Sequence, residues 1–210
     1  INAMAYYHGH PSDYDRWASQ GLPEWSYANV LPYFKRSEDW EGGADTWRGT
    51  GGPLTTRRAT FQDPICEAIL AAGREAQYPY TDDYNGENPE GFTRMQMTLR
   101  NGRRWSTARA YLRPAMKRPN LTVRTGAMVL GIDWEGTLAR GIRYSHRGNT
   151  QSASADREVI LSGGSINSPQ LLMLSGVGNP DRLRGHDIDT VVDLPGVGEN
   201  LSDHTSAALV

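Results

Sequence analysis

A short apolar run, two glycines and a helix-forming segment follow one another at residues 158–176, and this feature most constrains the fold. Val159, Ile160 and Leu161 form a continuous apolar run, which is typical of a strand buried on both faces. Gly163 and Gly164 come next, and residues 170–175 favour a short helix that ends at Gly176. Such a turn lets the backbone approach a ligand at the positive end of a helix, although glycines also serve turn geometry alone.

The residues between 120 and 150 alternate with a period of two. Segments 121–125, 130–134 and 140–144 each place apolar and polar residues in turn. A glycine-containing turn follows each of them, at Gly126, at Gly136 and around Gly148. This pattern predicts a small antiparallel meander.

The first 115 residues carry helix signals separated by loops. Pro and Ser, Thr or Asp residues mark the expected helix starts, because they suit the cap and first-turn positions. We expect helices that begin at Ser12, Ser26, Asp63 and at Ser106 or Thr107, a kink or a helix restart at Pro32, an irregular loop over 41–60 that includes a strand at 54–57, and a helix end near Pro114.

Charge and composition exclude several classes of function. The formal net charge is -2 and no run of Lys or Arg exceeds two residues, so we expect no nucleic-acid partner. No apolar stretch is long enough to cross a bilayer, so we expect no transmembrane segment. A single cysteine, Cys66, excludes an intramolecular disulfide and a multi-cysteine zinc site, and His8 and His10 lack a third ligand, so we predict no metal site.

The two ends of the sequence resemble cuts within a longer chain. The sequence opens on Ile1-Asn2 with no initiator Met or secretory pattern, and it closes on an apolar run, 206–210. We therefore expect an internal fragment, with a processed natural terminus as the alternative. We expect the cytoplasm as its location, with membrane association of the intact protein left open.

Seven segments in order resemble the glucose–methanol–choline (GMC) family of FAD-dependent oxidoreductases, most of all its choline-dehydrogenase-like members. The segment 164–178, Gly-Ser-Ile-Asn-Ser-Pro-Gln-Leu-Leu-Met-Leu-Ser-Gly-Val-Gly, matches a family signature at nearly every constrained position. The other six segments, which extend the resemblance over the whole chain, are 1–17, 25–34, 49–54, 100–112, 118–126 and 194–204.

The resemblance implies an α/β fold with α+β character. Part of a dinucleotide-binding FAD domain would interleave with part of an antiparallel-sheet substrate domain. We expect an FAD-domain segment over 1–50, a largely substrate-domain and lid segment over 51–115, and an FAD-domain segment over 116–210 that returns towards the substrate domain near 195–210.

The resemblance also implies FAD as cofactor. The residues it places near FAD are Asn2, Ala3, Met4, Ala5, Val129, Gly163, Gly164 and Ser165. Some family members attach FAD to a His immediately before the Asn. Here that position is Ile1, so we predict non-covalent FAD.

For the intact protein, the resemblance implies oxidation of a small alcohol to an aldehyde or ketone by hydride transfer to flavin, with oxygen or another electron acceptor. The family's G-x-G-x-x-G turn would precede Ile1, and its catalytic His and His or Asn partner would lie beyond Val210. We therefore assign no catalytic residue in this chain. The alternatives are a catalytically incompetent fragment and a lyase that keeps FAD without redox turnover.

Overall fold

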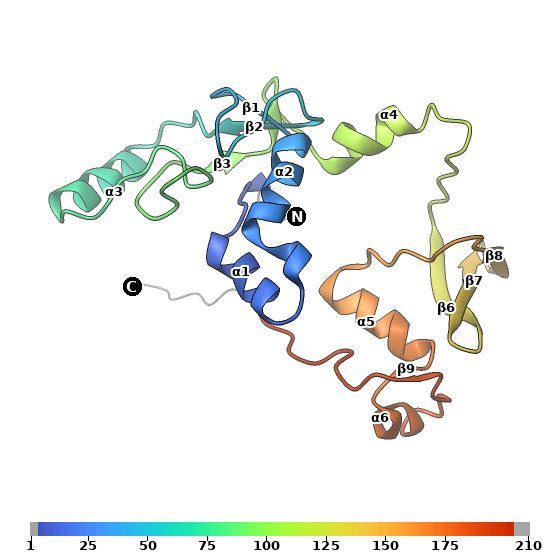
Figure 1. Ribbon diagram of the computed structural model, residues 1–210. Helices are drawn as coiled ribbons and strands as arrows, with labels where there is room; N and C mark the ends of the chain where they lie inside the picture. Colours follow the sequence, from blue (N-terminus) through green and yellow to red (C-terminus); the bar gives the residue numbers. More distant parts are fainter. Residues whose placement is uncertain (1–3, 204–210) are drawn as a thin grey trace. The chain divides into compact units, whose positions relative to one another are not determined.

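The computed structural model describes residues 4–203. The chain divides into two compact units, Ile1–Thr122 and Val123–Val210. Helices and strands are mixed in both units (Figure 1). The α/β fold class expected from the sequence is confirmed. The assignment of 1–50, 51–115 and 116–210 to an FAD domain and a substrate domain stays a prediction.

Unit 1 opens with two helices joined by a short 3-10 turn: α1 (Pro11–Ser19), η2 (Pro23–Trp25) and α2 (Tyr27–Ser37). Aromatic rings join the two helices, since Tyr14 of α1 meets Phe34 of α2 edge-on at a centroid distance of 5.7 Å. The N-cap of α1 is His10 and not Ser12, because the His10 ring nitrogen accepts from the Ser12 amide. Ser26 is the N-cap residue of α2, and Pro32 lies inside this helix without ending it.

A small three-stranded sheet follows in unit 1. Strands β1 (Glu38–Trp40) and β2 (Leu54–Arg58) pair in parallel, and β3 (Gln96–Met97) pairs antiparallel with β2. Strands β4 (Leu99–Arg100) and β5 (Arg103–Arg104) form a hairpin. Its turn residues Asn101 and Gly102 both have positive φ, as a tight hairpin requires.

The remaining helices of unit 1 begin close to their predicted starts. The Asp63 side chain accepts from the Ile65 amide at 2.8 Å and caps α3 (Pro64–Glu75). The apolar side chains Ile65 and Ile69 of this helix are exposed, and the residues it buries are Leu70 and Gly73. A π-helical turn, η3 (Ala108–Leu112), continues into α4 (Arg113–Ala115), so the helix ends one residue after Pro114, close to the predicted end.

Unit 2 contains the predicted meander. Strands β6 (Ala127–Glu135), β7 (Leu138–His146) and β8 (Asn149–Ser154) form an antiparallel sheet in that order. The core residues Ile132 and Tyr144 come from β6 and β7. Helix α5 (Gly164–Leu174) follows and contacts β6, since the Ser175 hydroxyl just after this helix accepts from the Ile132 amide at 2.9 Å.

The rest of unit 2 is a short helix between two paired strands. Strand β9 (Val177–Gly178) pairs in parallel with β10 (Val192–Asp193), and α6 (Pro180–Arg184) lies between them in sequence. The Asn179 side chain caps α6 by accepting from the Asp181 and Arg182 amides.

Two predicted strands are wrong. Residues 121–125 and 158–161 are irregular, and Ile160 is 76% exposed where the sequence predicted a strand buried on both faces. Apolar content and alternation express residue preference, but a strand also needs a neighbour for its backbone hydrogen bonds. Within residues 4–203 neither segment pairs with another strand, and the third strand of the meander is β8.

Candidate functional site

Helix α5 begins without a side-chain cap or an acidic first turn. Gly163 occupies its N-cap position. Gly164 has a φ of +88°, and a Cβ added there would meet no heavy atom within 4 Å. The Gly163 N–H donates to the Ser168 hydroxyl at 2.9 Å, and the N–H groups that follow it, with the positive dipole end of the helix, suit a phosphate or carboxylate.

A cavity of about 510 Å³ lies between β6 and α5. The backbone before α5 forms part of its wall, so Val129 of β6 and Gly163 meet in one cavity although they are far apart in sequence. The lining residues are Ala127, Met128, Val129, Ile160, Leu161, Ser162, Gly163, Asn167, Ser168, Gln170, Leu171 and Leu174. Most of these side chains are apolar, so the cavity suits a mostly uncharged ligand part.

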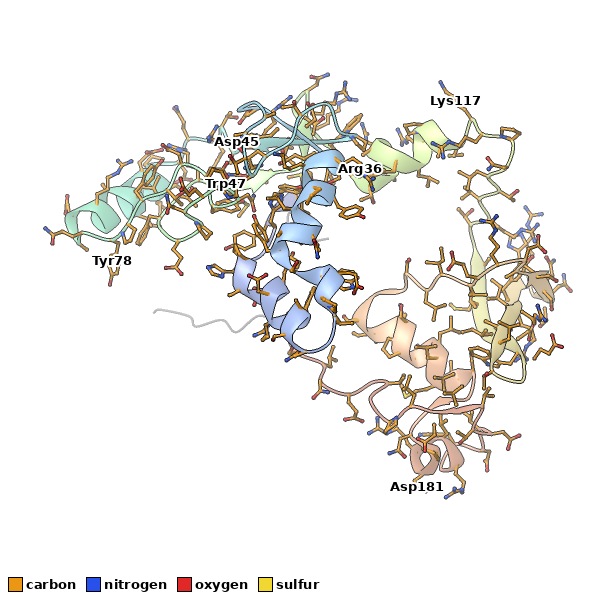
Figure 2. All side chains as sticks on the ribbon, viewed as in Figure 1. Arg36, Asp45, Trp47, Tyr78, Lys117 and Asp181 are labelled. Atoms are coloured by element: carbon orange, nitrogen blue, oxygen red, sulfur yellow. The ribbon has the colours of Figure 1, made fainter. Side chains whose placement is uncertain are left out.

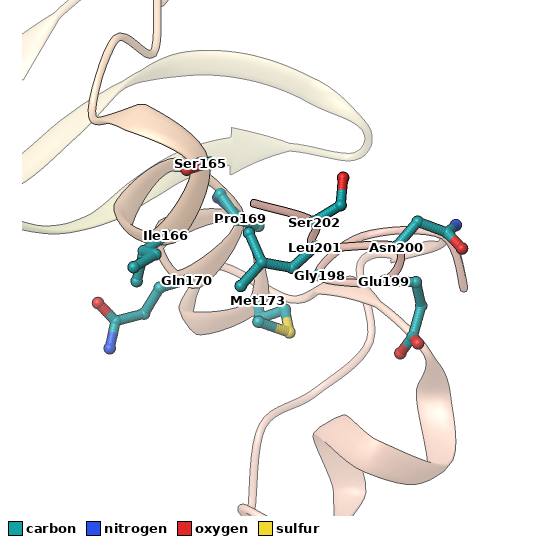
Figure 3. A pocket seen from close by; sticks show the side chains of 10 residues that line it. All are labelled: Ser165, Ile166, Pro169, Gln170, Met173, Gly198, Glu199, Asn200, Leu201 and Ser202. Carbon is teal, nitrogen blue, oxygen red and sulfur yellow. The ribbon is translucent and has the colours of Figure 1, made fainter. Parts of the chain in front are cut away.

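A second cavity, of about 640 Å³, lies between α5 and the loop 198–202. Figure 3 shows Ser165, Ile166 and Met173 on the helix side and Asn200 and Leu201 on the loop side. Ser165 is thus the predicted cofactor residue on this side. The loop itself was not among the predicted site residues, although the glycines of Pro195-Gly-Val-Gly198 signal a close backbone approach.

The other predicted site residues belong to unit 1. The Met4 carbonyl accepts from the Thr98 amide at 2.9 Å, and Ala5 forms an antiparallel bridge with Met97. Met4 has a φ of 67°, a left-handed conformation that is uncommon for a side chain of its size. Asn2 and Ala3 lie outside the described residues, as does Ile1, on which the prediction of non-covalent FAD depends.

A buried network of charged and amide side chains lies next to this segment in unit 1. The side chains of Glu38 and Arg48 are both fully buried and form an ion pair, and the Arg48 guanidinium lies 3.9 Å from the centre of the Trp40 ring. Burial opposes the charge of Arg48, but hydrogen bonds to Glu38 and the charges of Glu38 and Asp83 outweigh it and raise the Arg48 pKa.

The loop between β1 and β2 places Arg48 in this network. The Asp45 side chain accepts from the Trp47 amide at 2.7 Å and from the Arg48 amide at 2.6 Å, which folds the loop back on itself. Asp45 and Trp47 are labelled in Figure 2. Lys35 of α2 donates to the carbonyls of Asp45 and Thr46. Arg48 was not among the predicted site residues, because its only signal in the sequence is a position inside a glycine-rich loop.

His8 is the one buried histidine among the described residues. It is 3% exposed and stacks on Phe34, and its Nδ1 has no hydrogen-bond partner. Burial lowers the pKa of this imidazole to about 4, although the nearby Glu38 acts in the opposite direction. His8 is therefore neutral at pH 7 and out of reach of a substrate.

Residues 4–203 offer neither a metal centre nor a membrane span. No group of three or more His, Cys, Asp or Glu side chains there could hold a metal ion. No helix in that range is long and apolar enough to cross a membrane.

Comparison with known proteins gives one consistent family. Residues 1–206 match the family model for GMC oxidoreductases. The chain is 52% identical over 204 residues to mitochondrial choline dehydrogenase of Mus musculus, covering 97% of this chain and 34% of the relative. It is 50% identical over 204 residues to an oxygen-dependent choline dehydrogenase of Brucella anthropi, covering 97% of this chain and 37% of the relative.

Solved structures give the same result. Pyridoxine 4-oxidase from Mesorbium loti matches with a TM-score of 0.88 and 33% identity, over 93% of this chain and 39% of that chain. A formate oxidase matches with a TM-score of 0.80 and 28% identity, over 92% of this chain and 35% of that chain. The chain spans about a third of the length of the curated relatives it matches. It belongs to the GMC oxidoreductases, a family of FAD flavoproteins.

Proposed function

We propose that the protein containing these residues oxidises choline or a related small alcohol to an aldehyde, with FAD as the hydride acceptor. The observation that carries this proposal is the 50–52% identity to choline dehydrogenases along 97% of the chain. The geometry of unit 2 supports the cofactor, because it offers an uncapped helix start beside a mostly apolar cavity.

FAD supplies, when bound, a ring that accepts a hydride from the alcohol carbon. We assign its phosphates to the start of α5, at Gly163, Gly164 and Ser165, where the Gly164 and Ser165 backbone N–H groups would donate, since the Gly163 N–H already donates to Ser168. Val129 would border the adenine end through its backbone. Asn2, Ala3, Met4 and Ala5 would border the flavin. The bond to FAD would be non-covalent.

No described residue is proposed as the base that takes the hydroxyl proton. His8 is buried, and His10 is engaged at the cap of α1. The family resemblance, and not this elimination, implies a proton acceptor beyond Val210 in the intact protein. The 210-residue chain alone would be inactive.

The first test of the proposal is anaerobic titration of the full-length flavoprotein with choline. We expect the oxidised-flavin absorbance to bleach and to return when air or an artificial electron acceptor is admitted. Comparing the rates at which air and the artificial acceptor restore the absorbance shows whether oxygen or another acceptor reoxidises the flavin. Turnover of a substrate without bleaching would instead support the non-redox lyase. Acid precipitation should release FAD into the supernatant, and flavin retained in the pellet would contradict a non-covalent bond.

Two matched glycine variants test the assignment of the FAD phosphates to the start of α5. Gly164 and Gly136 both have positive φ and open space where a Cβ would lie, but Gly136 belongs to the turn between β6 and β7. Alanine at either position should cost about 1 kcal/mol of stability. Only Gly164→Ala should also weaken FAD binding, by about tenfold, or about 1.4 kcal/mol. Equal FAD affinity in both variants would overturn the assignment of the phosphates to α5.

A further inference from the structure

The backbone segment Met4–His8 is held by side chains and not only by strand pairing. The Asn85 side-chain oxygen accepts from the His8 amide at 2.7 Å, and the Asn85 side-chain NH₂ group donates to the Tyr6 backbone carbonyl at 3.1 Å. The Asn85 amide thus pairs with the backbone on both sides of Tyr7, as a neighbouring strand would. Asn85 is only 3% exposed, so these bonds are shielded from water.

The orientation of Asn85 is fixed by Gln96. The Asn85 NH₂ group also donates to the Gln96 side-chain oxygen at 2.9 Å. The Gln96 NH₂ group donates to Asp83 at 2.8 Å, and the Gln96 backbone carbonyl accepts from the Tyr6 amide at 2.9 Å. Gln96 is therefore bonded to the segment through its backbone and to Asn85 through its side chain.

The orientation of Gln96 is in turn fixed by Arg48. A guanidinium can only donate, and Arg48 donates to the Gln96 side-chain oxygen at 2.9 Å and to Asp83 at 2.6 Å. The amide of Gln96 must then direct its oxygen towards Arg48, and Asn85 must direct its NH₂ group towards that oxygen. The ion pair with Glu38 holds Arg48 in place from the other side. One charged group thereby determines the direction of every bond in the chain from Arg48 to Tyr6 and His8.

We propose that Arg48, Gln96 and Asn85 are positioning residues for the flavin-facing segment, with Asn85 as the group that clamps its backbone. The inference rests on the proposed function, in which residues 2–5 border the flavin. Met4 and Ala5 directly precede the clamped residues, and the Thr98 amide holds the Met4 carbonyl two residues after Gln96. Loosening the clamp would therefore change the place of Met4 and Ala5 relative to the flavin ring.

The test compares Asn85→Ala with Thr56→Val in the full-length flavoprotein. The Thr56 side chain is buried in the same network, but it donates to Glu38 and not to the Met4–His8 backbone. Three quantities are measured in each variant: hydrogen exchange at the Tyr6 and His8 amides, the flavin absorption and fluorescence spectra, and the flavin reduction potential. Unfolding by denaturant measures the stability that each substitution removes.

We expect Asn85→Ala to speed exchange at the His8 amide by about tenfold, in the FAD-stripped protein as well, because that amide loses its acceptor. The flavin spectra and reduction potential should shift in Asn85→Ala and stay at the wild-type values in Thr56→Val. The proposal is overturned if faster exchange leaves the spectra and potential unchanged, or if Thr56→Val shifts them equally. Failure of the proposed function is distinct, because the wild-type protein would then bind no FAD or show no reduction by choline.

Discussion

Unit 1 contains a buried ion pair, whereas the ion pairs of unit 2 among the described residues are exposed to solvent. In unit 1 the side chains of Arg48 and Glu38 are both 0% exposed, whereas in unit 2 those of Arg140 and Glu135 are 54% and 70% exposed. Unit 1 also buries the polar side chains of Thr56 and Gln96 completely. In unit 2 the large buried side chains among the described residues are apolar or aromatic: Ile132, Tyr144, Val177 and Leu183.

The buried ion pair of unit 1 determines the geometry of its core more than it adds to the stability of the unit. A buried ion pair gains little net stability because both charges lose their hydration, but it fixes the direction of each hydrogen bond around it. Unit 1 therefore has a core that specifies one arrangement of its backbone segments. Unit 2 depends on apolar contacts, and it leaves Met128, Ile160 and Ile166 exposed beside the cavities of its candidate site.

The largest expected effect comes from breaking the buried pair. Arg48→Met leaves Glu38 buried without its cation, so we expect a loss of about 3–5 kcal/mol in the free energy of unfolding of unit 1. Hydrogen exchange of amides in β1 and β2 measures this loss, and amides of β7 serve as the reference in unit 2. We expect the β7 amides to keep their protection.

A double variant tests whether the lost stability comes from the unpaired charge of Glu38. Glu38→Leu combined with Arg48→Met removes both charges, so it should recover part of the lost stability. A loss below about 1 kcal/mol for Arg48→Met alone would show that Glu38 is not isolated from water. The ion pair of unit 1 would then be no more shielded from water than the ion pairs of unit 2, contrary to the comparison made above.

The sequence predicted those parts of the fold that local chemistry determines. Asp63-Pro64 marks the start of α3, and alternation marks β6 and β7, because caps and period-two patterns act over a few residues. The strand expected at 158–161 failed because pairing depends on a distant neighbour. The Arg48 network was missed for the same reason, since Arg48 lies 48 positions from Gln96.

Some residues of the candidate site also have a local signal in the sequence, and others do not. The glycines at 163 and 164 are a local signal, and the structure places them at the start of a helix. Val129 came only from the family resemblance, because nothing in an alternating strand distinguishes one backbone position from the next. The loop 198–202 became part of a cavity wall only when the fold brought it to α5.

A second prediction concerns pH and again separates the units. The pKa of His8 is about 4 in the folded protein and 6.5 without burial, so the unfolded chain binds the proton more readily. The free energy of unfolding of unit 1 should then be highest above pH 6.5 and fall by roughly 3 kcal/mol as the pH drops to 4. Denaturant titration over this pH range, followed by hydrogen exchange in β1 and β2, measures the fall.

Two histidine variants test the origin of this pH dependence. His8→Phe keeps a flat ring against Phe34 and should flatten the profile of unit 1 between pH 6.5 and 4. His146→Gln replaces a histidine of β7 in unit 2 and should leave the profile of unit 1 as it is. A profile that stays steep in His8→Phe would mean that another group carries the dependence.

The smallest expected effect is at the exposed pair of unit 2. Arg140 donates to Glu135 at 2.6 Å across the β6–β7 turn, a bond as short as many in the buried network. Water hydrates both side chains before and after folding, so Glu135→Gln should change the free energy of unfolding of unit 2 by no more than about 0.5 kcal/mol, and added salt should reduce even this change. Hydrogen exchange of β7 amides at low and high salt measures it. A loss above about 1 kcal/mol would mean that charge matters to unit 2 as well, and burial would no longer explain why similar distances in the two units carry different energies.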